Sequence, residues 1–235
     1  MPINPAPGDL PLSKLPNFDP RKVPVQRVDT GLPAVPPSVL QADALRARFA
    51  LPPQWEPELW HERRFMDRPI AHASVLVPIV LRERPTVLLT ERTTHLSTHS
   101  GQVAFPGGKR DDTDTDEAHT ALREAQEEIG LAPDLVEVLG TLPTYTTGTQ
   151  FIITPVVGLV DPGHELTLNA HEVADAFEVP LEFLMNPAHH RHHALDVAGV
   201  RREWYSMPYR DGDVERFVWG ATAAMLRNFY RFLVA

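Results

Sequence analysis

Residues 107–131 read GGKRDDTDTDEAHTALREAQEEIGL, and they contain the clearest helical pattern in the chain. Apolar side chains recur there with the spacing of one helix face. They are Ala118, Ala121, Leu122, Ala125 and Ile129. Asp114, with Glu117 three residues later, suits a capping box, and Gly130 suits the residue that ends a helix. The stretch therefore predicts a glycine-initiated loop followed by a helix over 117–129.

The polar side of this helix carries three glutamates, Glu124, Glu127 and Glu128. They stand at i, i+3 and i+4, so they share one arc of the helix surface. Like charges at this spacing cost about 0.2–0.5 kcal/mol per pair on an exposed helix. A divalent cation such as Mg²⁺ or Mn²⁺ would remove that cost, because hard cations prefer carboxylate oxygen. From these letters alone, a solvated acidic helix remains the alternative.

Composition and charge limit the class of protein. The 235 residues are 43% apolar and 23% charged, which suits one globular core. Residues 111–137 carry ten acids and one base, and the other 208 residues balance at 21 of each, so we expect no nucleic-acid partner. No apolar run approaches the roughly 20 residues of a membrane span, and no signal peptide is evident, so we expect no membrane association and a cytoplasmic location. The absence of cysteine excludes disulfides, thiolate metal sites and a cysteine nucleophile.

The chain divides into an arm and a domain. Residues 1–37 are rich in proline and predict an extended arm, and residues 38–235 predict one domain that begins with a short helix over 38–51, N-capped by Ser38. Residues 73–90 predict a hairpin, and residues 91–114 a long loop. Further strands are expected at 136–142, 151–160 and 217–219, short helical turns at 174–177 and 181–184, and a final helix at 221–233. This mixture predicts an α/β fold in which helices flank a mixed sheet.

Residues 123–131, REAQEEIGL, resemble the ending of the Nudix box, and the whole motif spans residues 108–131 here. The resemblance implies the Nudix fold, a mixed β-sheet sandwiched between α-helices, and hydrolysis of a nucleoside diphosphate linked to another group. It also implies that Glu124, Glu127 and Glu128 bind Mg²⁺ or Mn²⁺ and serve catalysis. The family usually has a glutamate six residues after the glycine, whereas this chain has Asp114 in a loop that is one residue longer. Asp114 is therefore left out of the expected site.

Upstream, residues 88–108 read LLTERTTHLSTHSGQVAFPGG, similar to the signature of the coenzyme A pyrophosphatase branch of the Nudix family. Thr93 replaces a smaller residue of that signature, and Ser97 stands where its second arginine belongs. The resemblance extends over about residues 73–233. It implies that Arg92, Gly107, Gly108 and Arg123 belong to the substrate-binding region, with Arg123 orienting glutamates. In the later NAHEV segment, Glu172 is the candidate for a further catalytic carboxylate.

The function implied is metal-dependent cleavage of the diphosphate of coenzyme A or its thioesters, giving adenosine 3′,5′-bisphosphate and 4′-phosphopantetheine or its acyl derivative. Two alternatives stay open. One is a Nudix enzyme acting on ADP-ribose or another nucleoside diphosphate derivative, which Ser97 in place of the arginine keeps open. The other is a non-catalytic nucleotide sensor. The expected partner is a small molecule, and an exposed arm would fit a homodimer.

Several other polar groups are given no catalytic role. The HHRHH tract, residues 189–193, predicts a mobile polar loop. His95 and His99 lie inside the coenzyme A-type signature and are expected at most to contact substrate. Ser97 and Ser100 lack a nucleophile elbow. Lys109 and Arg110 are interpreted either as solvated turn residues or as phosphate contacts.

Overall fold

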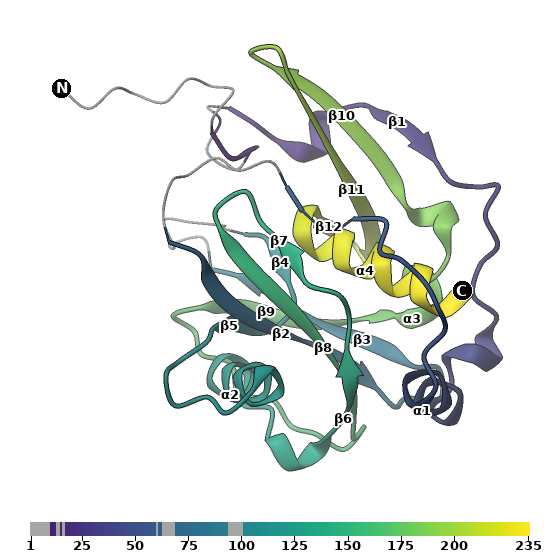
Figure 1. Cartoon of the computed structure of the whole chain (residues 1–235), viewed down its shortest axis with the longest axis vertical. Helices are drawn as coiled ribbons and strands as arrows, with labels where there is room; N and C mark the ends of the chain where they lie inside the picture. The colour runs from purple at the N-terminus through teal and green to yellow at the C-terminus, as the bar shows by residue number, and fades with distance from the viewer. Residues whose placement is uncertain (1–9, 13–14, 16, 60, 63–68, 94–100) are drawn as a thin grey trace.

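The computed structural model describes residues 10–12, 15, 17–59, 61–62, 69–93 and 101–235. Its main sheet has eight strands, and Figure 1 shows it between α2 on one side and α1 with α4 on the other. The strands are β2 (Ala71–Val80), β3 (Thr86–Arg92), β4 (Val103–Ala104), β5 (Gly107–Lys109), β6 (Val136–Thr141), β7 (Tyr145–Thr146), β8 (Phe151–Val160) and β9 (Val173–Pro180). The helices are α1 (Ala42–Ala50), α2 (Glu117–Ile129), α3 (Leu181–Leu184) and α4 (Gly220–Val234). This arrangement confirms the predicted mixed sheet between helices.

The sheet is mixed because β2 pairs in parallel with β8, while the other described pairs are antiparallel. Side chains of a strand point alternately to its two faces, and β2 obeys this rule. Leu76 and Val80 pack with α2, whereas Val77 and Ile79 pack in the core that contains α4. An apolar strand that is buried on both faces needs a helix on each side, and this pattern explains the sandwich.

A second sheet of four strands lies on the far side of α4, so α4 is covered on both sides (Figure 1). Its strands, in spatial order, are β1 (Val25–Val28), β10 (Arg191–Val197), β11 (Val200–Asp211) and β12 (Val214–Trp219). β1 belongs to the segment predicted to be an extended arm. The aromatic ring of Phe18, in the same segment, packs against Trp204 and Trp219 on this sheet.

The prediction of a mobile loop at the HHRHH tract is wrong. His189 ends a short 3-10 turn (Pro187–His189), and residues 191–193 lie in β10. His193 is buried, stacks on Trp204 and is hydrogen-bonded to the Val23 carbonyl and the Ser206 hydroxyl. Pairing with β11 along its whole length orders this strand.

The prediction of helix 117–129 is confirmed, and Gly130 ends it in the left-handed conformation, with φ of 71°. The predicted cap is wrong, because Asp116 accepts the His119 N–H at the helix start while Asp114 is engaged elsewhere. The expected helices at 181–184 and 221–233 correspond to α3 and α4. The helix predicted over 38–51 is divided into a 3-10 turn (Pro37–Leu40) and α1, with Gln41 rather than Ser38 at the α1 cap.

Two other local predictions are corrected. Residues 174–177 are not a helical turn but part of β9, which pairs with β3 along that strand's length. The expected loop over 91–114 contains β4 and β5, which pair with β3 and β2. Two further 3-10 turns, Pro20–Lys22 and Pro133–Leu135, complete the described elements. No helix among the described residues is both long and apolar enough to cross a membrane.

Candidate active site

The glycine pair at the start of the motif lies directly against α2. Gly107 and Gly108 belong to β5, which pairs with β2 opposite Val75 and Ser74. A β-carbon at position 108 would lie 2.5 Å from the carboxylate carbon of Glu124, and one at position 107 would lie 2.6 Å from the Val75 α-carbon. Gly107 also has φ of 154°, which other residues rarely adopt. Glycine at both positions therefore lets the strand pass beside the carboxylates.

Glu128 is the most buried of the three helix glutamates, with 5% of its side chain exposed. Its Oε2 accepts the backbone N–H of Gly107 at 3.1 Å, and its Oε1 lies 3.6 Å from Nη1 of Arg92. Burial raises the pKa of Glu128 to about 7, although the Gly107 hydrogen bond and the Arg92 charge oppose this. The charges of Glu124 and Glu172 raise the pKa further. The site thus holds a desolvated carboxyl group whose pKa lies close to neutral pH.

Arg123 brings the other two glutamates together. Its Nη1 lies 3.0 Å from Glu124 Oε1 and 3.1 Å from Glu127 Oε2. Burial raises the pKa of Glu124, with Arg123 opposing and the charges of Glu127 and Glu172 adding to the rise. Glu127 is more open, with 59% of its side chain exposed. Arg123 thus contacts both of these glutamates, and the role of orienting them that the resemblance implied stays a prediction.

Asp114 holds Arg123 from the other side, a role that the sequence did not indicate. Its two carboxylate oxygens accept Nε and Nη2 of Arg123, each at 2.9 Å. Oδ2 also accepts the Asp111 backbone N–H. The Arg123 hydrogen bonds hold the pKa of Asp114 far below its usual range. The side chain is fully buried, so Asp114 lies behind the glutamates as their support.

Glu172 lies beside this cluster although it is more than forty residues from α2 in the sequence. Its charge acts on both Glu124 and Glu128. The loop that carries it is hydrogen-bonded to the end of α2, where the Asn169 N–H donates to the Glu128 carbonyl at 2.9 Å. Asn169 and Thr93, which both contribute hydrogen bonds to this loop, were given no role in the site from the sequence. The only signal for them was their position within the two motif segments.

The remaining predicted residues differ in how the structure places them. Arg110 donates to the carbonyls of Asp114 and Thr115 at 3.3 Å, and its Nη1 lies 3.8 Å from Glu117, so it supports the loop. Lys109 is exposed, and its carbonyl accepts Arg123 Nη2. His95, Ser97, His99 and Ser100 lie outside the described residues.

The chemistry of the glutamate side chains suits a hard divalent cation. All of them offer carboxylate oxygens, which hard cations prefer. Burial and the repulsion between neighbouring carboxylates raise the pKa values of Glu124 and Glu128. A bound cation would offset both the burial of these charges and their repulsion. Within the described part of the chain, no three acidic or histidine side chains converge as tightly as metal ligands do. Instead, Arg123 holds Glu124 and Glu127, and Gly107 holds Glu128.

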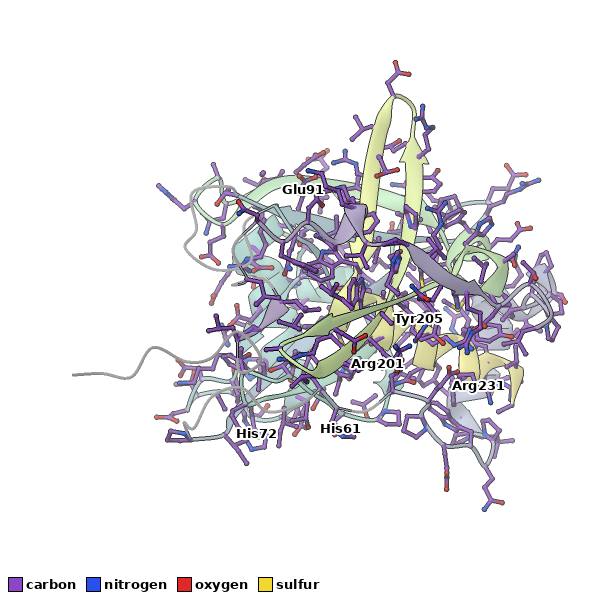
Figure 2. The ribbon with its side chains drawn as sticks, turned by 90° about the horizontal axis from the view of Figure 1, so that it is seen from above. His61, His72, Glu91, Arg201, Tyr205 and Arg231 are labelled. Atoms are coloured by element: carbon purple, nitrogen blue, oxygen red, sulfur yellow. The ribbon has the colours of Figure 1, made fainter. Side chains whose placement is uncertain are left out.

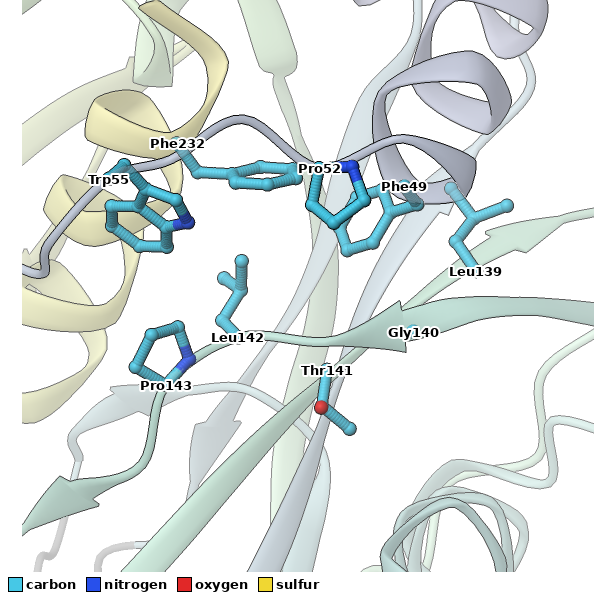
Figure 3. Close-up of a pocket in the computed structure, with 9 residues that line it drawn as sticks. All are labelled: Phe49, Pro52, Trp55, Leu139, Gly140, Thr141, Leu142, Pro143 and Phe232. Carbon is cyan, nitrogen blue, oxygen red and sulfur yellow. The ribbon is translucent and has the colours of Figure 1, made fainter. Parts of the chain in front are cut away.

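A separate hollow of about 350 Å³ lies on the other face of the sheet (Figure 3). In Figure 3 the rings of Phe49, Trp55 and Phe232 face Leu142 and Pro143 across it. Leu139, Gly140, Thr141 and Pro52 complete its lining. Among the described residues that line it there is no carboxylate or basic side chain, and none belongs to the carboxylate cluster.

A buried charged network also lies away from the cluster, around Arg227 of α4. Its guanidinium contacts Asp29 and Glu58 at 3.0 and 2.9 Å and lies over the ring of Tyr205. The Tyr205 hydroxyl donates to Glu58, and Arg231 lies 3.7 Å from the same carboxylate. Figure 2 labels Tyr205 and Arg231. This network joins the N-terminal segment to α4 and β11.

The family-model comparison and the sequence comparison both match Nudix proteins. The family model described as NUDIX domain matches residues 71–207, which include every predicted site residue. An uncharacterized Nudix hydrolase, NudL, of Pectobacterium atrosepticum is 41% identical over 196 residues, covering 83% of this chain and 95% of that protein. NudL of Escherichia fergusonii is 40% identical over 201 residues, with coverage of 81% and 94%. A crystal structure of a C. elegans Ap4A hydrolase complex has a TM-score of 0.42 and 21% identity, covering 51% of this chain and 86% of that one.

Proposed function

This chain belongs to the Nudix hydrolase family, and from that premise we propose that it hydrolyses the diphosphate of coenzyme A or its thioesters. The products are adenosine 3′,5′-bisphosphate and 4′-phosphopantetheine, or its acyl derivative. The substrate class rests on the signature over residues 88–108. The observation that supports the chemistry is the desolvated pair Glu124 and Glu128, which flanks Gly107 and Gly108.

Glu124 and Glu128, with Glu127, are the residues that would hold Mg²⁺ or Mn²⁺. The ion would supply positive charge to the diphosphate oxygens and lower the pKa of a water molecule. Arg123 keeps Glu124 and Glu127 on one side of the site, and its own orientation depends on Asp114. Removal of Glu127 should cost less than removal of Glu128, because Glu127 is more exposed.

The chain offers two kinds of proton acceptor for the attacking water. Glu172 is one, since its charge acts on both buried glutamates, and a helix glutamate is the other. A carboxylate within hydrogen-bond reach of the water can act as the general base. Arg92, which lies at the end of β3 beside Glu128, would bind a phosphate oxygen through its guanidinium.

The direct test is product analysis by mass after incubation with coenzyme A, its thioesters and ADP-ribose in competition, with saturating Mg²⁺. We expect the coenzyme A compounds to be cleaved at the diphosphate, and Glu128→Gln to lose about 100-fold or more in kcat. Near-normal turnover by Glu128→Gln would falsify the carboxylate assignment.

Ser97, in place of an expected arginine, keeps ADP-ribose or another nucleoside diphosphate derivative as the second candidate substrate. Faster cleavage of ADP-ribose in the same competition would reverse the ranking. Nucleotide binding without a metal-dependent product would instead favour the sensor alternative. The homodimer and the cytoplasmic location stay proposals, and the molar mass from light scattering tests the first.

A further inference from the structure

The loop over residues 167–172 is attached to the end of α2 by backbone hydrogen bonds. The N–H groups of Thr167 and Asn169 donate to the carbonyls of Ile129 and Glu128, both at 2.9 Å. The last carbonyls of a helix have no partner within the helix, and this loop supplies them. Its backbone is therefore placed relative to Glu128 itself.

Thr93, the residue that follows β3, is also hydrogen-bonded to this loop. Its backbone N–H donates to the Glu172 carbonyl at 3.0 Å, and its hydroxyl donates to the His171 carbonyl at 3.2 Å. The residue is 6% exposed. The preceding residue, Arg92, pairs with Val173 in the β3–β9 ladder. Thr93 thus extends the contact between these strands by two hydrogen bonds into the loop.

Asn169 contacts Glu172 directly. Its side-chain Nδ2 donates to Glu172 Oε1 at 3.4 Å, and its Oδ1 accepts the His171 N–H at 3.2 Å. Its carbonyl accepts the N–H groups of Glu172 and Val173, both at 2.9 Å. Asn169 therefore links the Glu128 backbone to the Glu172 carboxylate through a single residue.

We propose that Thr93 and Asn169 are positioning residues that hold the Glu172 carboxylate beside Glu124 and Glu128. The inference rests on the proposed function and deepens it. A glutamate on an exposed loop has three freely rotating side-chain bonds, and ordering it costs entropy. The Thr93 hydrogen bonds fix the loop backbone, and the Asn169 amide restricts the carboxylate. Displacement of a catalytic group by about 1 Å can cost on the order of 100-fold in rate.

The principal variant is Thr93→Val, which keeps the shape and loses the hydroxyl. Thr222→Val is the matched control, because Thr222 is also 6% exposed and donates to the Val103 carbonyl at 3.2 Å, but it lies in α4. We expect Thr93→Val to lower kcat by about tenfold, as support residues of this kind typically do. Its KM should stay unchanged, Thr93→Ser should restore turnover, and Thr222→Val should match wild type.

A double-mutant cycle with Glu172→Gln then tests whether the effect passes through Glu172. If it does, Thr93→Val will lower kcat much less in the Glu172→Gln background than in wild type. Asn169→Asp, which removes the Nδ2 donor and retains the Oδ1 acceptor, should behave in the same way. Independent of activity, hydrogen exchange of the Glu172 and Val173 amides should be faster in Thr93→Val than in Thr222→Val.

The failures can be told apart. A wild-type protein that cleaves none of the substrates sinks the proposed function. An active wild type with Thr93→Val indistinguishable from Thr222→Val overturns only this inference. Multiplicative losses in the double mutants overturn it as well, since they would show that Thr93 and Asn169 act independently of Glu172.

Discussion

The carboxylate of Glu124 lies where a side chain on Gly108 would begin. A β-carbon at position 108 would be 2.7 Å from Glu124 Oε1, much closer than non-bonded atoms approach. The atoms in conflict are the far end of a flexible side chain, so the protein can relieve the clash by moving that carboxylate. Glycine at this position therefore matters more for the position of Glu124 than for folding.

We expect Gly108→Ala to fold normally and to lose about 10- to 100-fold in kcat, because the displaced Glu124 carboxylate would no longer be in place to contact Arg123 and the proposed metal ion. Turnover with saturating Mg²⁺ and a thermal melt measure the two effects. Gly31→Ala is the control, since no atom of the described residues beyond its chain neighbours lies within 4 Å of a β-carbon there. Gly107→Ala should instead lower stability, because its β-carbon would meet the backbone of Ser74 and Val75. Full activity in Gly108→Ala would contradict the proposed use of Glu124.

Glu128 should make the metal-free protein less stable as pH rises. Its folded pKa of about 7 lies above the ordinary value of 4.5, so the native state binds this proton more tightly. The resulting stabilisation is fully present below about pH 4.5 and is lost as pH rises through 7, a change of about 3 kcal/mol. Glu128→Gln should remove this dependence and melt several degrees higher than wild type at pH 8 in a chelator.

Addition of Mg²⁺ provides the matching control for that prediction. A cation that binds the ionised carboxylates stabilises the folded state by mass action. The melting temperature of wild type at pH 8 should therefore rise with Mg²⁺, and that of Glu128→Gln should rise much less. Equal shifts in the two proteins would place the ion elsewhere.

The buried support of Arg123 should be sensitive to loss of charge at Asp114. In Asp114→Asn the new amide group cannot accept all of the Nε, Nη2 and Asp111 N–H donors that now converge on the carboxylate. We expect a loss of about 2–3 kcal/mol in unfolding free energy and a fall in kcat, because Arg123 also holds Glu124 and Glu127. Urea denaturation and turnover measure these. Asp112→Asn, on the exposed side of the same loop, should leave both unchanged.

The network around Arg227 should contribute to stability and not to chemistry. Arg227 is 3% exposed and contacts Asp29 and Glu58, so Arg227→Ala takes from both carboxylates the buried cation that they share. Breaking such a buried pair costs about 3–5 kcal/mol. Arg231→Ala is the control, because this side chain is 42% exposed and 3.7 Å from Glu58. A specific loss of kcat in folded Arg227→Ala, with its melting temperature unchanged, would refute this division of roles.

Local sequence determined where α2 begins and ends. Its apolar stripe, the acidic residue at its start and the left-handed Gly130 act within a few residues of one another, so their spacing predicts both ends of the helix. The same spacing places Glu124, Glu127 and Glu128 on one arc. The long apolar strand over 151–160 and the final helix follow from local pattern in the same way.

Tertiary structure decided the features that depend on distant partners. Residues 174–177 become strand because β3 offers a ladder, and the histidine tract becomes ordered because β11 pairs with it and Trp204 stacks on His193. Asp114 does not cap the helix, because its carboxylate is bound by Arg123 and by the Asp111 N–H. The nearness of Glu172 to Glu128 arises from a loop that follows the last carbonyls of α2. Sequence spacing could place three carboxylates on one helix, but only the folded chain could desolvate two of them and bring a further one beside them.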